Sequence, residues 1–105
     1  MRVFKSRDFT KWAEKENLPD SSLLKSIEEM NKGLIDAWLG GTIVKKRVAL
    51  ANQGKSGGFR TIIAFKLKDK AFFLYGFSKN SKANINKKEK EALKMYGNQL
   101  FSFKL

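Results

Sequence analysis

Apolar residues recur at helical spacing through the first third of the chain. The first such stretch is a helix whose start Ser6 or Asp8 can cap. Its apolar face is formed by Phe9, Trp12 and Ala13. The single proline of the chain then interrupts the pattern, and a second helix follows. The apolar positions of this second helix are Leu23, Ile27, Met30 and Leu34.

The apolar period changes from helical to alternating after the two glycines at positions 40 and 41. β-Branched residues predict a strand over residues 42–50, alternation predicts another over residues 59–67, and an apolar run predicts a buried strand over residues 71–77. A tight polar turn at residues 68–70 makes the last two strands antiparallel neighbours.

A polar loop then leads into a closing helix. Asn86 followed by Glu89 can form a capping box at its start. Its expected buried stripe consists of Ala92, Leu93, Tyr96 and Leu100. With a short strand over residues 2–5, the pattern predicts one α+β domain over residues 1–105, a small antiparallel sheet with two N-terminal helices and one C-terminal helix. We expect the helices on one face of the sheet and the other face open.

The chain is strongly basic, with 22 Lys and Arg residues against 10 Asp and Glu residues and a formal net charge of +12. This excess favours a polyanionic partner, either nucleic acid or an anionic membrane. Residues 1–50 carry 10 basic and 7 acidic groups, net +3, whereas residues 51–105 carry 12 and 3, net +9. The partner is therefore expected to lie mainly against the second half.

Cys and His are both missing from the sequence. Disulfides and thiolate metal sites are thus excluded, and so are the commonest metal ligand and the usual acid–base side chain at neutral pH. We expect no metal and no cofactor. No stretch approaches the roughly 20 apolar residues of a membrane span, and no apolar signal segment opens the chain. These features predict a cytoplasmic protein without a membrane partner.

The Gly-Lys-Ser sequence at residues 54–56 satisfies a relaxed phosphate-loop pattern together with Ala49. That motif requires a helix immediately after it, whose N-terminus receives the phosphates. Here the following residues lead into a predicted strand, and no apolar strand ending in Asp follows to hold magnesium. The chain is also too short for a doubly wound sheet. A nucleotide triphosphatase is therefore rejected, and the segment is interpreted as a basic, glycine-rich loop.

Basic residues gather around this loop. The two-residue period places Lys45 and Arg47 on one side of their strand and Arg60 on the face opposite Phe59. Neighbouring glycines let a phosphate chain approach the backbone closely. The candidate phosphate-binding residues are Lys45, Arg47, Lys55, Arg60 and Lys79. The alternatives are that the basic strand is a solvated edge that discourages aggregation, and that the loop is an ordinary flexible turn.

An aromatic run at residues 72–77 is expected to be mainly core. The alternative is that one of its rings faces RNA as a stacking platform. Tyr75 is the best candidate for that role because its hydroxyl can donate or accept a hydrogen bond. Trp12 and Trp38 are both expected to be packing residues in helical segments.

Three blocks of the sequence resemble the signature of the RelE/HigB toxin family. They are LGGTIVKKRVA at residues 39–49, GKSGGFR at residues 54–60 and FSKN at residues 77–80. The similarity is to the short branch of the family with a Gly-Lys-x-Gly-Gly-x-Arg block, and it spans nearly the whole chain. One block alone is a weak signal, but the spacing of the three together is fairly specific.

The resemblance implies a microbial-ribonuclease-like fold and cleavage of mRNA in the ribosomal A site. It also implies three partners: the ribosome, its mRNA and a cognate antitoxin, in this branch usually a helix-turn-helix repressor. By position, the resemblance makes Lys55, Arg60 and Lys79 the catalytic candidates, with Lys45 and Arg47 as flanking contacts. Together with Tyr75 and Asn80, these two flanking residues are the substrate-binding candidates. Some members place a Tyr or His after the last strand, where this chain has Asn80 and Asn84.

RNA cleavage does not require His. The 2′-hydroxyl can attack the adjacent phosphate while Arg and Lys stabilise the developing charge. A Lys crowded by other cations loses its proton more readily and can act as the base. Two other functions stay open: a non-catalytic basic RNA- or ribosome-binding module, and a gyrase-poisoning toxin on the same scaffold. A membrane-active peptide is disfavoured because the apolar residues fit a folded core.

Overall fold

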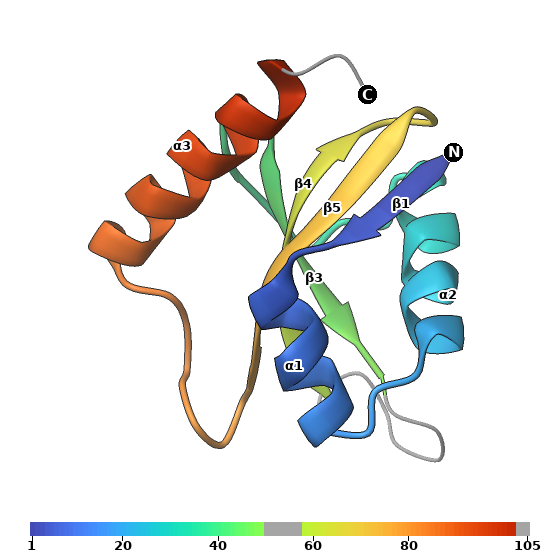
Figure 1. Ribbon diagram of the computed structural model, residues 1–105, viewed down its shortest axis with the longest axis vertical. Coiled ribbons are helices and arrows are strands. Elements are labelled where there is room, and N and C mark those ends of the chain that lie inside the picture. The colour runs from blue at the N-terminus through green and yellow to red at the C-terminus, as the bar shows by residue number, and fades with distance from the viewer. Residues whose placement is uncertain (50–57, 103–105) are drawn as a thin grey trace.

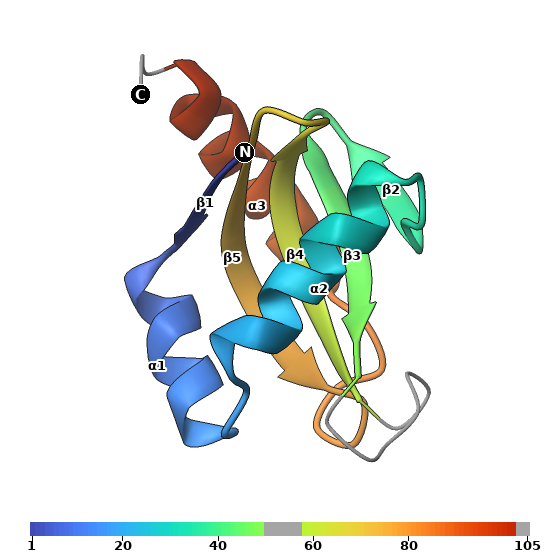
Figure 2. The same ribbon diagram turned by 90° about the vertical axis from the view of Figure 1, so that its right-hand side faces the viewer.

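The structure, a computed structural model, describes residues 1–49 and 58–102. Its elements are, in chain order, β1 (Arg2–Lys5), α1 (Arg7–Lys15), α2 (Asp20–Asn31), β2 (Ala37–Gly40), β3 (Ile43–Val48), β4 (Phe59–Lys66), β5 (Lys70–Ser78) and α3 (Lys87–Ser102). The α+β class is as predicted. Helices α1 and α2 lie on one face of the sheet and α3 on the other (Figures 1 and 2). The expectation that one face stays uncovered was therefore wrong.

The strands form one sheet in the order β1-β5-β4-β3-β2. The pairs β2–β3, β3–β4 and β4–β5 are antiparallel. The antiparallel pairing of β4 with β5 is as predicted, whereas β2 was not expected as a strand. β1 instead pairs in parallel with β5, with Arg2 opposite Lys70 and Lys5 opposite Phe73. The sheet is therefore mixed rather than wholly antiparallel. A parallel neighbour needs a long crossover, and here two helices and three strands separate the paired segments along the chain.

The segment after α2 is a strand and not a continuation of the helix. α2 ends at Asn31, and Gly33 adopts a φ of +91°, which favours glycine. The chain then forms β2, in which Ala37 lies opposite Lys45. Trp38 therefore lies on an edge strand and is 62% exposed, so its assignment to a packed helical position was wrong. A strand of 4 residues is too short for its two-residue period to be told from helical spacing.

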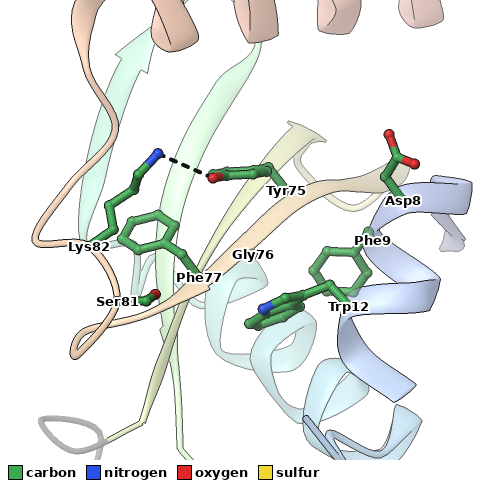
Figure 3. Close-up of a pocket in the computed structure, with 8 residues that line it drawn as sticks. All are labelled: Asp8, Phe9, Trp12, Tyr75, Gly76, Phe77, Ser81 and Lys82. Carbon is green, nitrogen blue, oxygen red and sulfur yellow. Dashed lines mark hydrogen bonds between the residues drawn. The ribbon is translucent and has the colours of Figure 1, made fainter. Parts of the chain in front are cut away.

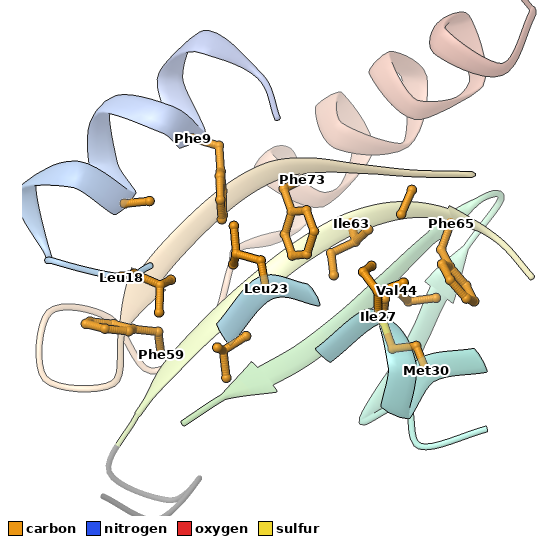
Figure 4. Close-up of a cluster of buried hydrophobic side chains, with 13 residues drawn as sticks. Phe9, Leu18, Leu23, Ile27, Met30, Val44, Phe59, Ile63, Phe65 and Phe73 are labelled. Carbon is orange, nitrogen blue, oxygen red and sulfur yellow. The ribbon is translucent and has the colours of Figure 1, made fainter. Parts of the chain in front are cut away.

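The larger hydrophobic core lies between the sheet and helices α1 and α2 (Figure 4). Its buried members are Phe9, Ala13, Leu18, Leu23, Ile27, Met30, Val44, Val48, Phe59, Ile63, Phe65, Ala71 and Phe73. Ser6 caps α1, since its hydroxyl accepts a hydrogen bond from the backbone N–H of Phe9 at 3.1 Å. The predicted apolar faces are confirmed except at Leu34, which lies beyond the end of α2 and is 56% exposed.

A smaller core lies between the sheet and α3. Its buried members are Ile43, Ile62, Ala64, Phe72, Leu74 and Phe77. Leu93 and Leu100 of α3 pack against it as predicted, whereas Ala92 and Tyr96 are exposed. Gly97 faces the sheet in their place. A single glycine carries no hydrophobic signal, so the sequence pattern placed the buried face of this helix at the wrong angle around its axis.

A bulge in β5 changes the face on which its side chains lie. The pairing register shifts between Ile62 and Ile63 of β4, which leaves Leu74 as an additional residue in β5. Leu74 and Tyr75 consequently both point towards α3, although they are consecutive. Tyr75 and Phe77 thus share the α3 face of the sheet, where the basic residues of β3 and β4 also lie.

Candidate nucleic-acid interface

Basic and aromatic residues form two neighbouring cross-strand rows on the α3 face of the sheet. In one row, Arg47 of β3 lies opposite Arg60 of β4, which lies opposite Phe77 of β5. In the other row, Ile62 of β4 separates Lys45 from Tyr75. Directly paired residues of an antiparallel sheet project to the same face. We call the surface formed by Lys45, Arg47, Arg60, Tyr75 and Phe77 the basic face.

Arg47 is held in place by Asp36, which precedes β2. One carboxylate oxygen accepts from the Arg47 backbone N–H at 2.6 Å, and the other pairs with the guanidinium Nε at 2.8 Å. Burial alone raises the pKa of Asp36, but these hydrogen bonds and the Arg47 charge outweigh it and hold the pKa below its ordinary value. The Arg47 side chain stays 44% exposed. The carboxylate therefore orients a guanidinium that still faces solvent.

Lys46 lies between Lys45 and Arg47 on β3, but its contacts stabilise the fold instead of contributing to the basic face. It projects to the opposite face, and its side chain is 3% exposed. Its ammonium lies 2.8 Å from a carboxylate oxygen of Glu29 on α2 and donates to the backbone carbonyl of Leu34 at 2.8 Å. The side chains of three consecutive basic residues thus alternate between the two faces of the sheet. Lys45 and Arg47 belong to the basic face, whereas Lys46 connects β3 to α2.

Arg60 is half-buried on the central strand β4. Its guanidinium makes a long hydrogen bond of 3.4 Å to the carbonyl of Gly58. No carboxylate in residues 1–49 or 58–102 forms an ion pair with it. Gly58 lies tightly against β3, because a Cβ there would sit 2.2 Å from the carbonyl oxygen of Val48. The backbone next to Arg60 is therefore tightly packed, while most N–H donors of its guanidinium have no partner among the described residues.

Two further predicted residues, Lys79 and Asn80, belong to the turn at one end of the sheet. Lys79 and Asn80 are exposed in the turn after β5, directly beyond Ser78, which pairs with Phe59. This pairing brings the turn to the end of β4 that carries Arg60. Lys55 lies outside the described residues, so its place relative to the basic face is not part of the structure.

Lys82 was not predicted from the sequence, but it joins the basic face to α3. Its ammonium donates to the Tyr75 hydroxyl at 3.2 Å (Figure 3) and forms an ion pair with Glu89. The same ammonium lies 5.3 Å from the centre of the Tyr75 ring, within cation–π range. Lys82 therefore fixes the position of the Tyr75 ring, and the charge of this lysine is neutralised by Glu89.

Glu89 has a second task at the start of α3. Its other carboxylate oxygen accepts from the Asn86 backbone N–H at 2.9 Å, and the Asn86 side chain accepts from the Glu89 N–H at 2.8 Å. These bonds confirm the predicted capping box. The hydrogen bond from Lys82 and then the one from Asn86 lower the pKa of Glu89. The hydrogen bonds to Glu89 and Tyr75 raise the pKa of Lys82. The sequence predicted Glu89 as a capping residue, but it did not predict the ion pair of Glu89 with Lys82.

Across the described ranges, no helix is long and apolar enough to cross a membrane. The fold and the basic face define a small cationic α+β domain with a surface suited to a polyanion. The family model for the RelE toxin of the RelE / RelB toxin-antitoxin system matches residues 1–105, and the chain belongs to this family. It is therefore a toxin of a toxin–antitoxin system, and the family implies an antitoxin as its partner. No curated protein matches the chain.

Proposed function

We propose that this toxin is an endoribonuclease that cleaves mRNA on the ribosome and thereby inhibits translation. The observation that carries the proposal is the opposed pair Arg47 and Arg60 on the basic face, with Lys45 in the neighbouring row. Placing two guanidinium groups opposite each other is unfavourable for the isolated protein. A bound RNA backbone turns this repulsion into attraction, and the net charge of +12 favours such a partner.

The chemistry that these residues can support is transfer of a phosphate within the RNA strand. The 2′-oxygen attacks the adjacent phosphorus, the bond from phosphorus to the 5′-oxygen breaks, and the products are a 2′,3′-cyclic phosphate and a 5′-hydroxyl. A proton leaves the 2′-hydroxyl and one joins the 5′-oxygen. Charge accumulates on the non-bridging oxygens in between, and preorganised donors such as Arg60 stabilise it.

We assign the roles as follows. Arg60 has uncommitted donors on the central strand β4 and contacts the scissile phosphate together with Lys79, which follows the neighbouring end of β5. Lys55 is assigned to the same phosphate. Arg47, oriented by Asp36, and Lys45 contact flanking phosphates. Tyr75 and Asn80 bind the substrate beside the cut. The assignment of Lys55 rests on the family resemblance alone.

Dependence on the ribosome fits the groups that the basic face offers. Cations stabilise charge well but align a flexible strand poorly, so a substrate already positioned in the ribosomal A site supplies the missing orientation. The similarity to the branch with the Gly-Lys-x-Gly-Gly-x-Arg block further leads us to propose a helix-turn-helix repressor as the antitoxin. An adjacent reading frame that encodes such a protein would support this part.

The test is primer extension on a defined mRNA incubated with the purified toxin, with and without ribosomes. We expect new 5′ ends within codons and only when ribosomes are present. Cleavage of the free message would remove the ribosome requirement. Ribosome binding without new 5′ ends would instead identify a non-catalytic binding module, and arrest of DNA supercoiling before translation would identify a gyrase poison.

A further inference from the structure

A cleft of about 300 Å³ lies beside the basic face, at the open edge of β5. β1 pairs only with the first half of β5, so α1 rather than a strand lies next to the second half. Trp12 lies on the α1 side of the β5 backbone, and Tyr75 and Phe77 lie on the other side (Figure 3). The volume is at the lower end of those that hold small ligands, which suits one planar group.

Trp12 forms the wall of the cleft on the α1 side. Gly76 makes this placement possible, because a Cβ there would lie 2.2 Å from the indole ring. The ring packs edge-on against Phe59, with centroids 5.1 Å apart, so it is fixed from behind. Within the described residues, no acceptor takes a hydrogen bond from the indole nitrogen. Aromatic walls of this kind bind nucleic-acid bases by stacking, since every base has a π-face.

The polar groups of the cleft indicate which part of an RNA enters it. Asp8, in the first turn of α1, lines the cleft, and its carboxylate has no ion pair or hydrogen bond within residues 1–49 and 58–102. The opposing cation, Lys82, is already compensated by Glu89. A free carboxylate repels a phosphate and accepts hydrogen bonds without donating any. The matching ligand is therefore a base that presents adjacent N–H groups.

We propose that this cleft binds one guanine base of the RNA, next to the phosphate that Arg60 contacts; this inference rests on the proposed function. Guanine carries two neighbouring donors, its ring N1–H and its exocyclic amine, which can meet the two oxygens of Asp8 together. Phe77 connects the two sites, because it lines the cleft and lies directly opposite Arg60. A strand with a phosphate on Arg60 thus needs to turn only its adjacent base across one β-strand to reach Trp12.

The test uses guanosine 5′-monophosphate as the probe and the fluorescence of Trp12 as the readout. The chain has two tryptophans, and Trp38→Phe on the far edge strand leaves Trp12 as the only reporter. We expect a saturable signal with this nucleotide. Inosine 5′-monophosphate, which lacks the exocyclic amine, should bind about tenfold more weakly, and adenosine 5′-monophosphate more weakly still.

Asp8→Asn provides the decisive variant, and Glu14→Gln on the exposed side of the same helix is its control. Asp8→Asn should lower guanosine monophosphate affinity about tenfold and remove its advantage over adenosine monophosphate, whereas Glu14→Gln should change neither. The proposal is overturned by equal affinities for the three nucleotides, by an unchanged preference in Asp8→Asn, or by the lack of any saturable signal.

Failure of this inference is distinguishable from failure of the proposed function, because nucleotide binding requires neither ribosomes nor cleavage. Ribosome-dependent cleavage by a protein that shows no base preference in the fluorescence assay would sink the cleft assignment alone. Selective guanine binding by a protein that never cuts a message would support the cleft and contradict the endoribonuclease.

Discussion

Arg47 and Arg60 lie directly opposite each other on β3 and β4. Asp36 compensates the first of them, and none of the described carboxylates compensates the second. Directly opposed like charges destabilise a sheet, by an amount comparable to the 0.2–1 kcal/mol or so that a favourable cross-strand pair contributes. The pair therefore reduces the stability of the free toxin and strengthens its attraction for a polyanion.

Replacing Arg60 with Ala should separate activity from stability. We expect the cleavage rate to fall by about 10²–10³-fold, since one preorganised donor to a developing oxyanion is lost. The free energy of unfolding should stay level or rise, because the repulsion with Arg47 disappears. Cleavage kinetics and urea unfolding measure the two quantities, and Lys25→Ala on the exposed face of α2 is the charge-matched control. A folded Arg60→Ala protein with the wild-type rate would place Arg60 outside the active site.

The neighbouring residues Lys45 and Lys46 should respond oppositely to the same substitution. Lys46→Met removes the buried cation beside Glu29 and should lower the free energy of unfolding by about 3 kcal/mol, while RNA affinity is largely kept. Lys45→Met should weaken RNA binding with little effect on stability, since it removes a half-buried cation from the basic face. Thermal or urea unfolding and filter binding make the comparison. Equal losses of stability in both variants would contradict the parity argument.

Acid should destabilise the toxin in part through Asp36. Its pKa in the folded protein lies below the ordinary value, so its contribution to stability is fully present above the unfolded pKa of about 3.9 and is lost as the pH falls through the lower folded value. Asp36→Asn should therefore show a flatter decline of unfolding free energy below about pH 5. If the unfolding free energy of the wild type and of Asp36→Asn falls equally at low pH, the interaction between Asp36 and Arg47 does not persist in solution.

RNA binding should depend strongly on salt. Four or five phosphate contacts on single-stranded RNA predict a slope of about −3 to −4 for the logarithm of the affinity against the logarithm of the salt concentration. Removing one contact, as in Arg47→Gln, should reduce the magnitude of the slope by about 0.7. A titration of labelled RNA over a range of potassium chloride concentrations measures both. A slope near zero would show that the basic excess has another purpose.

The sequence predicted the parts of the fold that depend on local chemistry. The Ser6 cap, the Asn86–Glu89 capping box and the parity that separates Lys46 from its basic neighbours all follow from spacings of two to four residues. Such spacings are set by helix and strand geometry, so no knowledge of distant segments is needed.

The features that escaped prediction depend on tertiary contacts that helix and strand spacing do not determine. The parallel pairing of β1 with β5 joins segments that no short-range pattern connects. Trp38 follows a helical spacing that the positive φ of Gly33 interrupts. Lys82 gains its role from contacts across seven residues to Tyr75 on one side and Glu89 on the other, through a loop whose path the sequence does not specify. The cleft at Trp12 likewise needs α1 to lie on a strand edge that β1 leaves free.

Because of the bulge at Leu74, we expect β5 to tolerate substitutions better than the deletion of a residue. The extra residue shifts the alternation of β5 by one position, and it is this shift that turns Tyr75 and Phe77 towards Arg60 and Gly76 towards Trp12. Deletion of a single residue here would leave the rest of the sequence unchanged, but it would move the side chains in the second half of the strand to the opposite face of the sheet. Along this strand, the number of residues determines the composition of the basic face as much as their identity does.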